Sequence, residues 1–374
     1  MDKDTKTMIV SQVIAIVIGL AVTILVAIWF GVSIYSDLPF GYLFLFAACM
    51  VAVMLHILVH EMGHVIFGKL SGYKFMAIIV LGMCLVKDNG KIRRTHLPLM
   101  GAAGGTLILP EGGFKEDTPY RMMLLGGAFM NILLAAVCGI LFIMDIHPLL
   151  NVFMWGGMII GIFVAIPNLI PFSFGFMVND AMMIRLFKKD EASKRCVYYA
   201  QMRMYAILLG TDRTAIPVPE HLPHDNRLGD SIRFAIAEDE LNFKRFGPAL
   251  ERFKELLGNF EENSFAYKLV DLHILLIHEL NGADREVIDE IYKGKMRKFV
   301  DAQGKAIPMA LLFRVSYEKR FGTGSVNVDR LVKMFNKLTR KVGSAADFER
   351  EIMASLLAGG MRPADDNGAE EDIG

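Results

Sequence analysis

The sequence lacks an excess of either charge, and it lacks paired cysteine motifs. Its 374 residues contain 40 Lys and Arg and 40 Asp and Glu, which gives a formal net charge of zero. A neutral chain has no long-range field to attract nucleic acid, so the composition argues against a nucleic-acid partner. The cysteines are scattered and form no CxxC pair: Cys49, Cys84, Cys138 and Cys196. We therefore expect small buried hydrophobic residues rather than a disulfide framework, a metal site or a redox site.

Charged residues are scarce before about residue 185 and frequent after it, although 53% of the whole chain is hydrophobic. This asymmetry predicts a membrane-embedded half followed by a soluble half. The predicted parts are an intramembrane domain over 1–189, a cytosolic helical domain over 190–358 and a disordered acidic tail over 359–374.

Four apolar segments in the first half are long enough to cross a membrane, which takes about 20 apolar residues in a helix. The predicted spans are 8–31, 41–67, 122–144 and 148–167. Residues 8–31 lack the small-x-small cleavage site of a signal peptide, which favours a transmembrane helix. The next apolar segment, 168–187, contains Pro171 and Gly175, so we predict an interrupted helix there rather than a fifth span.

The basic residues predict how these spans are oriented. The loops at 32–40 and 145–147 contain no Lys or Arg, whereas basic residues flank the other ends of the spans. By the positive-inside rule both termini then lie in the cytosol. The prediction is a multi-pass integral protein, embedded in the lipid bilayer of a bacterial-type cell membrane.

A turn signal, Asp-Asn-Gly, separates two short apolar runs that lie between the second and third spans. The runs, KFMAIIVLGMCLV and KIRRTHLPL, are too short to cross a membrane as helices. We therefore predict a membrane-associated β-hairpin over residues 75–97. The glycine-rich segment 101–105 lacks the Lys and Ser or Thr of a phosphate-binding loop, and it predicts a turn.

Beyond residue 190, apolar residues recur at the spacing of soluble amphipathic helices. The predicted helices are 229–240, 246–258, 264–280, 284–300, 306–319, 327–341 and 345–358. Paired antiparallel helices, as in a helical-repeat array, are expected. The predicted fold is thus a polytopic α-helical membrane protein with four transmembrane helices, an interrupted apolar segment, a β-hairpin and a C-terminal all-α soluble domain. A regulatory partner is expected at that C-terminal domain, by analogy.

Three histidines and a glutamate lie in the second predicted span, in HILVHEMGH at residues 56–64. Such groups each cost on the order of 3 kcal/mol in hydrocarbon and are seldom kept without a function. His60 and His64 share a helix face, about 6 Å apart along the axis, so they can bind one ion. In HExxH enzymes the glutamate, here Glu61, moves a proton from the metal-bound water to the leaving amine. His56 is expected to support the site or to pack beside it.

A hydrolytic zinc site usually has three protein ligands and one open position for water. Asp37 and Asp145 lie on the extracytosolic side in the predicted topology. Asp180 lies near the cytosolic side, as does His64, so we predict that Asp180 is the third ligand of Zn²⁺. An N-cap of the helix in NDAMMIRLF is the other role that the local sequence supports for Asp180.

These motifs resemble those of the site-2 proteases, the intramembrane zinc metalloproteases of peptidase family M50. Three segments match in order. They are HEMGH at 60–64, GAFMN at 127–131 against the family's GPxxN, and NLIP followed by ND over 168–180 against its NxxP and DG. Together they cover roughly residues 40–187, about half of the chain.

The resemblance implies a zinc metalloendopeptidase whose substrate is a membrane protein or a signal-peptide remnant. It also implies that Asn131 holds the substrate or stabilises the oxyanion, as an amide donor can. Helix packing by Gly126, Gly127 and Asn131 is the alternative role. Ala128 and Ala181 replace the family's Pro and Gly. A metal transporter, an inactive scaffold homologue and a zincin whose third ligand is a glutamate are the other functions that we considered.

Overall fold

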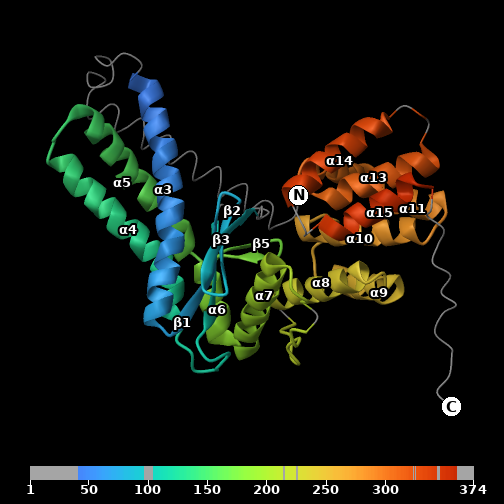
Figure 1. Cartoon of the computed structure of the whole chain (residues 1–374), viewed down its shortest axis with the longest axis horizontal. Helices are drawn as coiled ribbons and strands as arrows, with labels where there is room; N and C mark the ends of the chain where they lie inside the picture. The colour runs from blue at the N-terminus through green and yellow to red at the C-terminus, as the bar shows by residue number, and fades with distance from the viewer. Residues whose placement is uncertain are drawn as a thin grey trace. The chain divides into compact units, whose positions relative to one another are not determined.

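We describe a computed structural model of the chain over residues 41–96, 104–213, 215–224, 226–322, 324, 326–342 and 346–359 (Figure 1). The predicted span at 8–31 and all but the first residue of the predicted tail lie outside the described residues. The chain divides into two compact units, with the division between Gly229 and Asp230 in the sequence.

Three long apolar helices, side by side in Figure 1, form the most apolar part of the first unit. They are α3 (Gly41–Leu70), α4 (Arg121–Ile143) and α5 (Pro148–Leu169). Each has the length and composition of a membrane-spanning helix, over Phe46–Leu70 in α3 and over all of α4 and α5. They correspond to the second, third and fourth predicted spans.

Glycine allows α3 and α4 to approach very closely beside the HExxH motif. A Cβ atom on Gly63 would lie 2.3 Å from the carbonyl oxygen of Gly126, and a Cβ on Gly126 would lie 2.7 Å from that of Gly63. Small residues at a crossing permit this backbone contact between membrane helices. The contact holds the histidine-bearing face of α3 directly against α4.

A four-stranded antiparallel sheet lies between α3 and α4 in sequence. Its strands are β1 (Tyr73–Val80), β2 (Met83–Asp88), β3 (Lys91–His96) and β4 (Gly104–Pro110), in the order β3-β2-β1-β4. The predicted antiparallel pairing is confirmed, but the hairpin expected at 75–97 is wrong in detail because it contains three strands.

Backbone conformation explains the difference from the predicted hairpin. Leu81 and Gly82 both have positive φ angles, of 50° and 83°, and they form a turn inside the first apolar run. Asn89 and Gly90 form the expected turn, with φ angles of 48° and 82°. The turn expected over 101–105 is also wrong in part, because β4 already begins at Gly104.

The interrupted apolar segment after α5 folds as a small hairpin and then a helix. β5 (Ser173–Phe174) pairs with β6 (Met177–Val178), and α6 (Asp180–Lys189) and α7 (Glu191–Leu209) follow. The side chain of Asn179 accepts a hydrogen bond from the Met182 amide and is the N-cap of α6. The N-cap role considered for Asp180 is therefore wrong, because the neighbouring asparagine fills it.

The second unit consists of helices, as predicted. They are α8 (Arg227–Asn242, which begins at the end of the first unit), α9 (Phe246–Leu257), α10 (Phe265–Leu280), α11 (Arg285–Ile291), α12 (Gly294–Gln303), α13 (Pro308–Phe321), α14 (Val328–Val342) and α15 (Asp347–Leu357). The single helix expected over 284–300 is wrong. Gly294, with a positive φ of 56°, starts α12 separately.

Candidate metal centre

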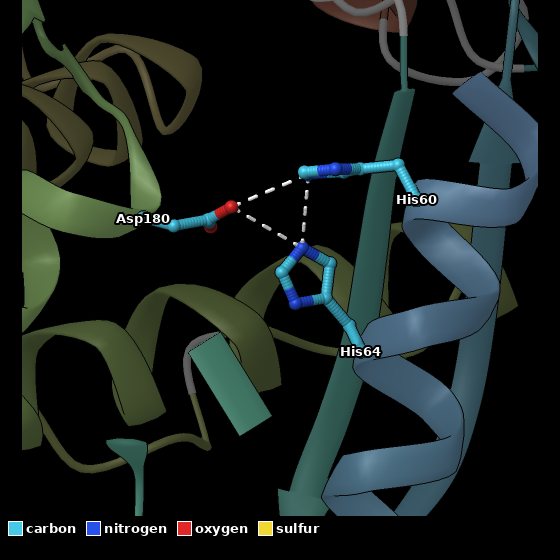
Figure 2. Close-up of side chains that lie close together, drawn as sticks. All are labelled: His60, His64 and Asp180. Atoms are coloured by element: carbon cyan, nitrogen blue, oxygen red, sulfur yellow. Dashed lines mark hydrogen bonds and ion pairs between the residues drawn. The ribbon is translucent and has the colours of Figure 1, made fainter. Parts of the chain in front are cut away.

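Three buried side chains of metal-ligand type converge in the first unit (Figure 2). His60 and His64 project from adjacent turns of α3, and Asp180 faces them from the start of α6. The two Nε2 atoms lie 3.3 Å apart. Oδ2 of Asp180 lies 3.3 Å from Nε2 of His60 and 3.4 Å from Nε2 of His64. The structure thus brings together the three residues that the sequence analysis selected.

The spacing of these three atoms fits a tetrahedral zinc ion. Ligands about 2.0–2.1 Å from zinc, at the corners of a tetrahedron, lie about 3.3–3.4 Å from one another. Oδ2 of Asp180 is also buried, and apart from the two facing imidazoles it has no hydrogen-bond partner among the described residues. Burial of a carboxylate oxygen is costly, and a cation bound among the three atoms would offset that cost. The residues present therefore fit the predicted metal.

The charge of Asp180 suits the same role. Burial raises the pKa of this carboxyl group, but the facing imidazoles of His60 and His64 outweigh burial and lower the pKa to about 2. The group is therefore ionised at neutral pH. Ionised carboxylate is the form that can bind a metal ion.

Outer contacts fix the orientation of two of the three side chains. Nδ1 of His64 lies 2.8 Å from the carbonyl oxygen of Met123, to which it can donate, so that the lone pair of Nε2 points toward the centre. Asn179 donates to the carbonyl oxygens of Pro167 and Ile170, at 2.6 and 2.7 Å. These bonds tie the start of α6, and with it Asp180, to the end of α5.

Two residues of β4 set the position of the Glu61 carboxylate. The sequence analysis did not identify this contribution. Thr106 Oγ1 donates a hydrogen bond to Glu61 Oε2 at 2.7 Å. A Cβ atom on Gly104 would lie 2.6 Å from Glu61 Oε1, so a side chain at that position would displace the carboxylate. The glycine-rich segment was the available signal, but its partner could not be identified before the strand was placed.

A cavity of about 710 Å³ opens onto this centre. His60, Glu61, His64 and Asp180 line it, together with Gly104–Thr106 of β4 and residues of β6. β4 is an outer strand of the sheet, and its residues Gly104–Thr106 line the cavity. Farther along the strand, the Ile108 amide donates to the side chain of Gln201 at 3.2 Å. The centre therefore lies beside both a space for a ligand and a backbone edge.

Asn131 and His56 lie behind the centre, and neither lines this cavity. Both side chains are fully buried. Nδ2 of Asn131 lies 3.1 Å from Nδ1 of His60, and its Oδ1 lies 3.2 Å from Nδ1 of His56. His56 is separate from the three converging ligand atoms, as expected for a supporting residue.

Comparison with known proteins gives a family for part of the chain. A family model described as Peptidase family M50 matches residues 48–147, which include His60, Glu61, His64 and Asn131 but end before Asp180. No curated protein and no solved structure matches the chain. M50 is a family of membrane-embedded metallopeptidases. The resemblance seen in the sequence is thus confirmed: residues 48–147 are a domain of peptidase family M50, the site-2 protease family.

Proposed function

We propose that this chain is an intramembrane zinc metalloprotease that hydrolyses a peptide bond within or near a transmembrane segment of its substrate. The observation that carries the proposal is the triangle of ligand atoms from His60, His64 and Asp180, beside the glutamate of the same HExxH motif. The M50 domain supports the class of reaction.

His60, His64 and Asp180 would hold the zinc ion. When bound, zinc polarises a carbonyl group and lowers the pKa of bound water toward about 7. Glu61 accepts a proton from the attacking water and delivers it to the leaving amine. The hydrogen bond from Thr106 keeps one carboxylate oxygen in place, so Glu61 carries the proton from a fixed position.

An extended substrate segment would pair with the outer edge of β4 at Gly104–Thr106, the part of the strand beside Glu61. The sequence analysis expected an added strand on the 75–97 hairpin, but β4 is the strand that lines the cavity and contacts Glu61. Main-chain hydrogen bonds to a sheet edge recognise a backbone without requiring a particular sequence. A transmembrane substrate helix would have to unwind to pair with this edge. The water needed for hydrolysis would come from the cytosol, because the proposed site lies near the cytosolic side.

Two other functions make different demands on the same residues. A metal transporter needs ligands along a path to both membrane faces, whereas His60, His64 and Asp180 form the one such cluster within the described ranges. An inactive scaffold has no need of a glutamate held by Thr106. Both observations favour the protease.

Replacement of Glu61 by glutamine separates the three functions. Membrane-retained peptides are compared by mass spectrometry in cells that express either wild type or Glu61→Gln, and zinc content is measured on both purified proteins. A protease loses cleavage but keeps zinc, and uncut substrate accumulates. Glu111→Gln, at an exposed position outside the cavity lining, is the matched control. Metal transport that survives in Glu61→Gln, with no peptide difference, would overturn the proposal in favour of a transporter.

A further inference from the structure

A buried row of polar groups connects the candidate metal centre to α5. Nδ1 of His60 contacts the Asn131 carboxamide, whose other end contacts Nδ1 of His56. Nε2 of His56 lies 2.8 Å from the carbonyl oxygen of Gly157. The row crosses three helices, from α3 to α4, back to α3 and on to α5.

The helices leave space for these two imidazole rings. A Cβ atom on Gly127 would lie 2.6 Å from Cε1 of His60, and one on Gly161 would lie 2.4 Å from Cε1 of His56. A side chain at either glycine would displace the ring beside it. The position of each ring therefore depends on a glycine of the facing helix.

Hydrogen-bond chemistry limits which way the Asn131 carboxamide can face when a metal is bound. With Nδ2 toward His60, the amide donates to Nδ1, so the proton of a neutral His60 ring lies on Nε2. That nitrogen faces Asp180 and His64, and a protonated nitrogen cannot bind a metal ion.

The same orientation also leaves a mismatch at the other end of the row. Oδ1 of Asn131 then accepts from Nδ1 of His56, which leaves Nε2 of a neutral His56 as an acceptor. The carbonyl oxygen of Gly157, 2.8 Å away, is an acceptor as well. A doubly protonated, charged ring would relieve the mismatch, but a charge at a fully buried site is costly.

We propose that Asn131 and His56 are positioning residues for His60, and that the Asn131 carboxamide presents Oδ1 to His60 and Nδ2 to His56 when a metal is bound. Oδ1 then accepts from Nδ1–H of His60, and Nδ2 donates to Nδ1 of His56. His56 in turn donates from Nε2–H to Gly157. Each of the three hydrogen bonds of the row now joins one donor to one acceptor, both rings are neutral, and Nε2 of His60 has a free lone pair. The inference rests on the proposed zinc function.

Either orientation of the carboxamide fills the same space, because its oxygen and nitrogen ends are nearly equal in size. His64 differs, since its outer partner is the backbone carbonyl of Met123, which cannot exchange donor for acceptor. His60 is therefore the ligand whose tautomer, and so its ability to bind the metal through Nε2, depends on a neighbouring side chain.

The test measures zinc affinity of the purified full chain by competition with a chelator. Asn131→Leu keeps the side-chain size but removes both hydrogen bonds, and we expect about 10- to 100-fold weaker binding. Asn131→Asp keeps an acceptor toward His60 and loses the donor, so it should bind zinc more tightly than Asn131→Leu. If the amide served as a donor to His60, the Asp variant would instead be as weak as the Leu variant.

His56→Phe tests whether His56 acts through Asn131. Alone it should weaken zinc binding by less than Asn131→Leu does, and in the Asn131→Leu background it should have no further effect. The visible absorption of the Co²⁺-loaded protein should change in Asn131→Leu and stay unchanged in Val137→Ala, a substitution at an exposed position of α4.

Three outcomes overturn the inference. They are wild-type zinc affinity in Asn131→Leu, equally weak binding in Asn131→Leu and Asn131→Asp, and losses that multiply in the double variant. A failure of the proposed function is distinct, because a wild-type chain that binds no zinc would overturn both.

Discussion

Both units of this chain bury ionisable side chains, but these side chains have different partners. In the first unit, the ligand atoms of His60, His64 and Asp180 converge on one point, where a metal ion could bind. In the second, His273 of α10 donates to the carbonyl of Leu269 at 2.7 Å, if Nδ1 carries the proton. Its ring packs against two phenylalanines.

Glu279, also on α10, is another buried group with protein partners. It accepts a hydrogen bond from Ser316 at 2.8 Å and lies 3.1 Å from a guanidinium nitrogen of Arg320. Burial of an ionisable group therefore does not by itself indicate a site. Several ligand atoms that converge on one point indicate one, because a single bound cation could satisfy all of them.

The largest expected difference between the two units is in catalysis. Glu61→Gln should lower the cleavage rate by about 10²- to 10⁴-fold, because it removes the group that moves the proton. Glu279→Gln changes a glutamate that is buried just as deeply, so cleavage per folded molecule should be unchanged. Both variants are assayed in liposomes with the substrate identified from membrane-retained peptides. Equal rates in the two variants would contradict the assignment of Glu61.

The next largest difference between substitutions in the two units should be in zinc affinity. Asp180→Ala removes a proposed ligand, so affinity should fall by more than about 100-fold, the upper end of what the loss of an outer partner costs. His273→Phe, in the second unit, should leave zinc affinity unchanged. Metal content and chelator competition measure both. If Asp180→Ala keeps wild-type affinity, this carboxylate is not in the ligand set.

Acid should lower the folding stability of the second unit through His273, whether or not a metal is bound to the first. Burial lowers the pKa of His273 from 6.5 to about 4. Between these values the unfolded chain binds a proton that the folded chain does not, so stability is complete above about pH 6.5 and is lost as the pH falls. The loss should reach about 2 to 3 kcal/mol near pH 4.

Denaturant unfolding across this pH range tests the effect. The His273→Phe variant, which has no group to titrate, should lose that part of the pH dependence. A pH dependence identical to that of wild type would show that another group is responsible.

The smallest contrast concerns glycine. Gly127→Ala places a methyl group against the His60 ring, so zinc affinity should fall by about tenfold, as for loss of an outer contact. Gly247→Ala, in helix α9, meets no atom within 4 Å and should stabilise the second unit by about 0.5–1 kcal/mol. Chelator competition and thermal unfolding measure the two effects. Unchanged zinc affinity in Gly127→Ala would mean that the His60 ring can move freely.

The sequence was sufficient where function depends on neighbours along one helix. The spacing of His60 and His64 predicts a shared face, and the hydrophobic periodicity predicts the helices of the second unit. Asp180 could be selected because the hydropathy pattern gives an approximate membrane depth for each residue, and Asp180 and His64 have similar depths. Each of these inferences needs local information alone.

The remaining features depend on contacts between distant segments. Asn179 holds Asp180 in place through carbonyl groups at the end of α5, and Thr106 holds Glu61 from a strand 45 residues further along the chain. Nothing in the local sequence around these residues identifies such partners. Leu81 was missed for another reason: a non-glycine residue with positive φ breaks the usual preference, so the turn within the apolar run carried no signal.

The contact between Gly63 and Gly126 changes how HEMGH should be understood. Written as HExxH, the motif has two interchangeable central positions. Here they are unequal, because Met62 is 41% exposed on the outer surface of α3, whereas Gly63 touches the main chain of α4. Position 62 can therefore vary with the surrounding lipid, but position 63 keeps the registration of the two helices. In this protein, helix packing requires glycine at position 63 of the motif, a position at which the catalytic chemistry requires no particular residue.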